Sequence, residues 1–88
     1  MDYSYYEKVI TNCYDVPFME RGLLLYAFKS DCIEVIDDGY IESDKVVVFK
    51  NDFGFNLMVR VEHDFKCTVL ECDNLDALSF NNFDKIFC

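Results

Sequence analysis

The sequence predicts an α+β fold, in which an antiparallel β-sheet of three to five strands has one or two N-terminal helices packed on one face. Apolar residues in the first thirty positions follow helical spacing, whereas residues 32–72 change to the two-residue alternation of half-buried strands. The chain has 88 residues, of which 52% are apolar, so it can bury a core without metals or disulfides. We therefore expect residues 1–88 to form a single compact domain.

The first predicted element is a short helix from about residue 5 to residue 14. Ser4 and Glu7 form a capping-box pattern, because the hydroxyl of Ser4 can accept from the amide three residues on while Glu7 reaches back. A helix over this range would place four residues on one apolar stripe, namely Tyr6, Val9, Ile10 and Cys13.

Residues 16–30 allow two interpretations. In the first, Asp15 caps a second helix, Pro17 lies in its first turn, and the helix is apolar nearly all round. Gly22 weakens this interpretation, because glycine in a helix interior is unfavourable. In the second, residues 23–28 form a strand that turns at residues 29–31 into residues 32–37. The helix is favoured narrowly.

The strongest local prediction is a hairpin of residues 45–50 and 55–62, closed at Gly54. Its second strand alternates strictly, so one set of side chains should face the core, namely Phe55, Leu57, Val59 and Val61. Before the hairpin, the Asp-Asp-Gly sequence at 37–39 predicts a turn between two short strands.

After the hairpin, residues 62–65 are expected to turn into a further strand over residues 66–72. Asp73 and Asn74 could then cap a short terminal helix with an apolar side made of Leu75, Leu78, Phe83 and Ile86.

Net charge is the clearest functional signal, because seventeen acidic residues face eight basic ones and give −9. This argues against direct nucleic-acid binding and against an anionic membrane surface, which both need basic side chains. The acid is also clustered, and residues 31–44 contain no Lys or Arg. The predicted partner-binding residues are Asp31, Glu34, Asp37, Asp38, Glu42, Asp44, Glu62 and Asp64.

The chain lacks the residue patterns of common catalytic and metal sites. It has one histidine, no tryptophan and no glycine-rich phosphate loop, and its Asp52-Phe53-Gly54 is a hairpin turn without the other kinase motifs. A zinc site of His63, Cys67 and Cys72 is disfavoured, because the two cysteines should point to opposite faces of one strand. We expect no enzymatic activity, no cofactor and no metal.

Five cysteines, an odd number, and the absence of a signal-peptide pattern at the first residues fit reduced thiols in a cytoplasm. The longest apolar run is far shorter than the ~20 residues of a membrane-spanning helix, so we expect no membrane association.

These observations predict a small inhibitor that binds a basic protein partner, namely a nucleic-acid-binding enzyme whose groove it occludes with carboxylates in place of phosphates. Phage inhibitors of uracil-DNA glycosylase and many anti-CRISPR proteins share this size and charge, although no motif connects the chain to them. One alternative is an immunity protein or antitoxin that neutralises a basic toxin. Another is an oligomerisation module whose aromatic surface comprises Tyr3, Tyr5, Tyr6, Phe80, Phe83 and Phe87. The sequence allows either a monomer or a homodimer.

Overall fold

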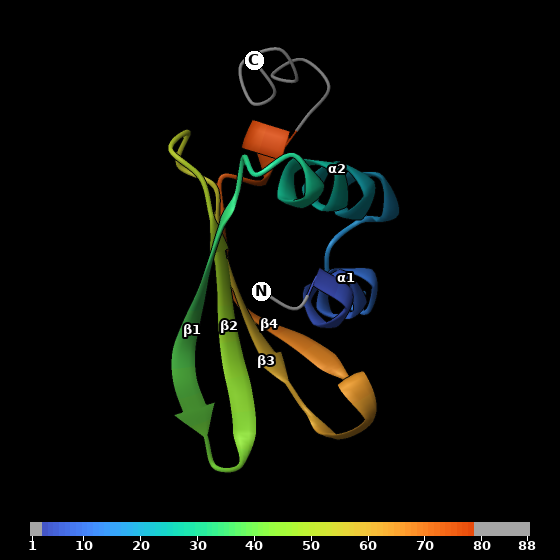
Figure 1. The fold of residues 1–88 in the computed structure, drawn as a ribbon, viewed down its shortest axis with the longest axis vertical. Coiled ribbons are helices and arrows are strands. Elements are labelled where there is room, and N and C mark those ends of the chain that lie inside the picture. The colour runs from blue at the N-terminus through green and yellow to red at the C-terminus, as the bar shows by residue number, and fades with distance from the viewer. Residues whose placement is uncertain (1–2, 79–88) are drawn as a thin grey trace.

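The computed structural model describes residues 3–78, in which two helices precede a four-stranded antiparallel sheet. The strands lie in the order β1-β2-β3-β4, so each pairs with its neighbour in sequence. Both helices lie on the same face of the sheet (Figure 1). The α+β fold is therefore confirmed. The element bounds are α1 Tyr3–Thr11, α2 Phe18–Lys29, β1 Glu34–Ile41, β2 Asp44–Lys50, β3 Asn56–Val61, η1 His63–Phe65, β4 Cys67–Asp73 and η2 Leu75–Leu78.

Helix α1 has the predicted buried stripe but different ends. Val9 and Ile10 have no solvent exposure, as the helical spacing predicts, whereas the equally buried Cys13 lies beyond the last helical residue, Thr11. The helix already includes Tyr3, so Ser4 lies inside it and the predicted cap is wrong. The carboxylate of Glu7 instead lies 3.4 Å from the ammonium of Lys29 on α2, an ion pair that joins the two helices.

Helix α2 settles the ambiguity of residues 16–30 in favour of a helix. It begins at Phe18, and Pro17 occupies the N-cap position, one residue before the predicted place. Asp15 is therefore not the cap. Only one side of α2 is buried, that of Leu23, Leu24, Ala27 and Phe28. As predicted, the sequence of the helix is apolar nearly all round. Because the core uses only one side, several large apolar side chains on the other side remain exposed.

Strand β1 runs straight through the Asp-Asp-Gly sequence that predicted a turn, so that prediction is wrong. The register with β2 shifts between Asp37 and Tyr40, which is a β-bulge, and Gly39 adopts a φ of 98° there. A glycine with positive φ serves a bulge as well as it serves a turn. The actual reversal comes later, at the turn between β1 and β2, where Glu42 has a φ of 57°.

The hairpin of β2 and β3 is confirmed, with Val47 paired to Val59 and Phe49 to Leu57. Gly54 closes it with a φ of 91°. The side-chain oxygen of Asn51 accepts hydrogen bonds from the amides of Phe53 (3.0 Å) and Phe55 (3.1 Å) and so holds the loop. Phe55, Leu57, Val59 and Val61 are all buried, as predicted.

Strand β4 is confirmed, but it contains a bulge that the sequence did not reveal. Val69 pairs with Val59 and Glu71 with Met58, so Leu70 is an extra residue. The bulge restores the phase of the strand, and Cys67 and Cys72 pair with residues 61 and 57 of the same sheet face. The prediction that they point to opposite faces is wrong. Beyond β4, η2 is a 3-10 turn, and the rest of the predicted terminal helix lies outside the described residues.

The core lies between the helices and the sheet. Phe28 of α2 and Phe49 of β2 meet edge to face, with ring centroids 6.5 Å apart. The opposite sheet face is covered by no other element within residues 3–78 (Figure 1). Val46 and Val48 on it are nevertheless buried. The register places Val46 beside Arg60, and long side chains cover apolar neighbours with their stems.

Candidate functional site

The eight predicted carboxylates divide into groups at different places on the sheet. One group lies at the end where β1 turns into β2 and β3 leads into β4 (Figure 1), and it comprises Glu42, Asp44, Glu62 and Asp64. Asp31 and Glu34 lie at the opposite end, where the chain leaves α2 and enters β1. Asp37 and Asp38 lie between the two groups on β1, which is an edge strand.

Arg60 of β3 organises the first group, which we call the acidic end. Its Nε and Nη2 donate hydrogen bonds of 2.9 and 2.7 Å to one carboxylate oxygen of Asp44, and Nη2 lies 3.5 Å from a carboxylate oxygen of Glu42. The hydrogen bonds that Arg60 donates to Asp44 raise the pKa of Arg60, and the charges of Glu42 and Glu62 act in the same direction. Two carboxylates therefore contact one guanidinium, with a third nearby, which leaves an excess of negative charge.

The members of the acidic end differ in how accessible they are. The side chain of Asp44 is only 25% exposed, whereas those of Glu42 and Asp64 are 84% and 89% exposed. Glu62 is half-buried and accepts a hydrogen bond from the hydroxyl of Thr68. Asp44 and Glu62 are thus held within the fold, while Glu42 and Asp64 project into solvent beside Arg60 and His63.

Asp37 is directed to the helical side of the sheet and belongs to a network there. Its carboxylate accepts a hydrogen bond of 3.2 Å from the hydroxyl of Tyr6 and lies 3.3 Å from the ammonium of Lys45. That ammonium also lies 4.7 Å from the centroid of the Tyr5 ring, a cation–π contact. Burial, the largest single influence, lowers the pKa of Lys45, but the hydrogen bond to Asp37 and the electrostatic effects of Asp37, Tyr6 and Tyr5 together outweigh it, and the pKa is raised.

At the opposite end of β1 the carboxylates are exposed and loosely held. The hydroxyl of Tyr3 donates to Asp31 at 3.4 Å, and the carboxylate of Glu34 lies 3.9 Å from the ammonium of Lys50. These distances are at the long limit for such contacts, so both groups can exchange their partners with little cost.

The fold supplies basic groups that the acidic segment lacks in sequence. Lys45, Lys50 and Arg60, from β2 and β3, each contact a predicted carboxylate. Sequence reasoning missed them, although the correctly predicted hairpin register already places Arg60 beside the start of β2. Residues 31–44 contain no basic residue, but the surface that they form does, because Lys45, Lys50 and Arg60 lie beside them.

Charge is nonetheless divided unequally between the two layers. Residues 3–30, which contain both helices, carry three acidic and three basic side chains and are neutral. Residues 31–78, which contain the sheet, carry twelve acidic and four basic side chains, for a net charge of −8. The acidity of the described chain therefore lies entirely in the sheet.

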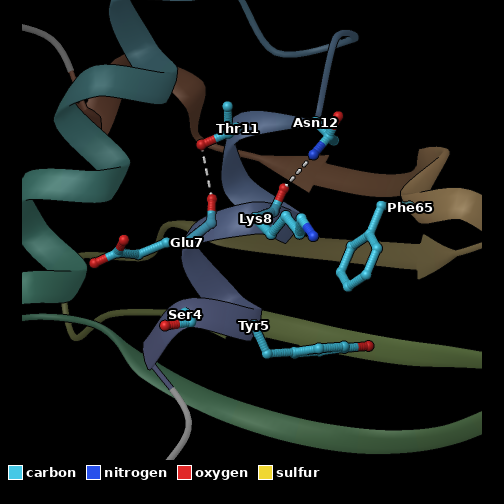
Figure 2. A pocket seen from close by; sticks show the side chains of 7 residues that line it. All are labelled: Ser4, Tyr5, Glu7, Lys8, Thr11, Asn12 and Phe65. Atoms are coloured by element: carbon cyan, nitrogen blue, oxygen red, sulfur yellow. Dashed lines mark hydrogen bonds between the residues drawn. The ribbon is translucent and has the colours of Figure 1, made fainter.

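A shallow depression of about 640 Å³ lies between α1 and η1, against Lys8 and Phe65 (Figure 2). The ammonium of Lys8 sits 4.8 Å from the centroid of the Phe65 ring. Thr11 and Asn12 direct their donors to backbone carbonyls of the same helix, at 2.8 and 2.7 Å. The side-chain donors of Thr11 and Asn12 are therefore used by the helix itself, while Glu7 pairs with Lys29 of α2.

The residues suspected of zinc binding do not converge, and within residues 3–78 there is no cluster of three metal-ligating side chains. The side chain of His63 is 95% exposed. Cys67 instead contacts Cys13 in the core, where the hydrogen bond between the two thiols and burial both raise the pKa of Cys13. The four described cysteines are unpaired by disulfides, which makes Cys13 and Cys67 packing residues.

In comparisons with known proteins, no family model, no curated protein and no solved structure matches this chain. None of the helices in residues 3–78 combines the length and apolar character needed to cross a membrane.

Proposed function

We propose that this protein works by binding, without catalysis, and that its acidic sheet blocks the nucleic-acid groove of a basic partner protein. The observation that carries the proposal is the separation of charge: residues 31–78, which form the sheet, have a net charge of −8, and residues 3–30, which form the helices, have a net charge of zero. Carboxylates spaced along strands can take the place of phosphates toward a groove lined by Lys and Arg. Unpaired thiols favour a reducing compartment, so we place this activity in the cytoplasm.

Within the sheet, the acidic end is the best candidate for the contact. Arg60 fixes Asp44 at 2.7 Å, which gives this end a rigid base, while Glu42 and Asp64 extend from it into solvent. Because the strands that carry these carboxylates are already ordered, a partner has to immobilise only their side chains and not the backbone. Asp38, exposed on the edge strand, adds to the same negative field.

The test uses a variant that removes exposed charge and keeps the two hydrogen bonds between Arg60 and Asp44, namely Asp38→Asn, Glu42→Gln and Asp64→Asn together. Asp44 is kept, because its two hydrogen bonds to Arg60 make it structural. The control removes the same number of charges at the other end of the sheet, with Asp52→Asn, Asp73→Asn and Asp76→Asn. All three control residues are exposed.

Each protein is immobilised and used to capture proteins from a lysate of the source cell, with and without added double-stranded DNA. We expect the wild type and the control to retain a basic nucleic-acid-binding protein that DNA displaces, and the test variant to lose most of it. Association measured with the purified partner should slow as salt rises, because screening shortens to about 8 Å at physiological ionic strength. A captured basic toxin without affinity for DNA would contradict the partner class, and a salt-independent rate would contradict the electrostatic mechanism.

A further inference from the structure

The outward side of α2 and the loop before it expose several large apolar side chains. They are Tyr14, Phe18, Met19 and Tyr26, with relative exposures of 74%, 81%, 57% and 53%. With ~150–250 Å² in a whole aromatic side chain, these four present on the order of 500 Å² to solvent. That lies near the upper limit for the largest apolar patch of an ordinary monomer.

This surface is ordered by its own contacts. The guanidinium of Arg21 lies 5.1 Å from the ring centroid of Tyr14 and 5.6 Å from that of Phe18, between the two rings. Its Nη1 also donates a hydrogen bond of 2.7 Å to the carbonyl of Thr11 at the end of α1. The aromatic residues at the start of α2 are therefore held in place before any partner arrives.

A small apolar depression of about 240 Å³ lies beside Phe18, between α2 and the end of α1. Four of its lining residues are Phe18, Arg21, Gly22 and Leu25, with Ile10 and Thr11 of α1 at the side. The four follow the spacing i, i+3, i+4 and i+7, which is the arrangement of the hole that receives a side chain from a facing helix. The surface thus offers both projecting side chains and a place to receive one.

Gly22 lines the depression, and no contact or backbone angle within residues 3–78 requires a glycine there. It lies inside α2, where glycine is less favourable than alanine. A Cβ built on it meets no atom within 4 Å, and no positive φ requires a glycine there. The absence of a side chain at this position would allow the backbone of a second helix to approach α2 closely.

We propose that the outward side of α2 is the interface of a symmetric homodimer, in which the α2 helices of two copies cross antiparallel near Gly22. A two-fold contact needs a surface that complements itself, and here the hole and the projecting rings belong to the same helix. With the axis near Gly22, Phe18 of one copy lies opposite Tyr26 of the other, each about 6 Å from the axis along the helix.

Charge and area both favour a second copy as the occupant. Residues 3–30 are neutral, so two copies can meet through their helices, while their sheets of net charge −8 stay on the outer sides. The four exposed side chains supply most of the ~800 Å² per partner that a stable interface buries, and the polar residues beside them can supply the rest. The dimer would then carry two acidic sheets that face in opposite directions, which goes beyond the proposed function and does not depend on it.

The experiment measures the mass of the full chain by light scattering and sedimentation from low micromolar to millimolar concentration. We expect the wild type to change from the 10.4 kDa monomer to twice that mass. Gly22→Leu fills the hole with a good helix former, and Phe18→Ala removes a projecting ring. Each should raise the dissociation constant by about 100-fold or more.

The matched control is Tyr40→Ala, which removes an aromatic side chain of 72% exposure from β1, in the sheet layer. Its dissociation constant should equal that of the wild type. Because the Cβ of Gly22 has open space around it, Gly22→Leu should keep the circular dichroism spectrum of the monomer, so that loss of the dimer is not loss of the fold. A wild type that stays monomeric at every concentration overturns the proposal, and so does a dimer that survives both α2 variants.

Discussion

The helical layer and the sheet of this protein are equally necessary to one core but have different surfaces. The helices are electrically neutral and expose large aromatic rings at the start of α2, whereas the sheet carries a net charge of −8. On the outer sheet face the most central apolar residues, Val46 and Val48, are already buried although no described element covers them. The difference teaches that charge and exposed apolar area are separated between the two layers, and this separation is the basis of the two binding proposals above.

The largest expected effect comes from comparing two phenylalanines of α2. Phe28 is 2% exposed, and its ring lies 5.2 to 6.5 Å from those of Tyr3, Tyr6 and Phe49, whereas Phe18 is 81% exposed. Phe28→Ala should lower the free energy of unfolding by about 3–5 kcal/mol, because it leaves a cavity. Phe18→Ala should change it by less than about 0.5 kcal/mol in dilute solution. Urea unfolding measures both, and equal effects would refute the assignment of the two sides of the helix.

The second prediction compares two bases of the sheet. Arg60 makes two hydrogen bonds to the half-buried Asp44, while Lys50 makes one long contact of 3.9 Å to the exposed Glu34. Arg60→Ala should therefore lower the melting temperature by several degrees, since it uncovers Val46 and leaves Asp44 without its donor. Lys50→Ala should leave it nearly unchanged. If Asp44→Asn adds its full effect to that of Arg60→Ala, the two residues do not act as a pair.

The third prediction concerns pH at the junction of the two layers. Burial raises the pKa of Tyr5 and of Tyr6 on α1, and the pKa of Lys45 on β2 is also raised. The folded protein then holds these protons more tightly than the unfolded chain does. Their contribution to stability is complete below the ordinary phenol pKa of 10.0 and is lost as pH rises through the folded values.

Urea unfolding at several pH values from neutral to strongly alkaline should therefore give a midpoint that falls above pH 10. Tyr6→Phe should make this fall shallower, because it removes one of the titrating groups. Tyr14→Phe removes a hydroxyl whose partner is Asn12 and which takes no part in the contacts of Tyr6, Asp37 and Lys45, so it serves as the matched control. A midpoint that rises in alkali would contradict the direction of all three pKa shifts.

Much of the fold could be predicted because local patterns and tertiary packing agree there. The β2–β3 hairpin has strict alternation and a glycine at the turn, so its register and buried face follow directly. The stripe of α1 is correct for the same reason. These elements need no information from elsewhere in the chain.

The errors arose where the same local sequence serves two structures. Asp37, Asp38 and Gly39 suit a turn, but pairing with β2 carries the strand through them as a bulge. The bulge at Leu70 has no sequence signal, and it reversed the predicted facing of Cys72. The acidic site was predicted only in part, because the bases that neutralise it come from other strands and depend on the register of the whole sheet.

The smallest expected effect compares a glycine from each layer. Gly22 of α2 has ordinary helical geometry and open space at its Cβ, so Gly22→Ala should raise the free energy of unfolding of the monomer by about 0.5–1 kcal/mol. Gly54 of the hairpin has a φ of 91°, and a Cβ there would lie 2.8 Å from the side-chain amide nitrogen, Nδ2, of Asn74. Gly54→Ala should therefore destabilise the protein.

Chemical denaturation at low micromolar concentration, where a helix-mediated dimer would dissociate, isolates the effect on the single chain. Two substitutions of the same sign would show that one of these glycines has been misread, and a destabilising Gly22→Ala would mean that α2 packs against something in the monomer itself.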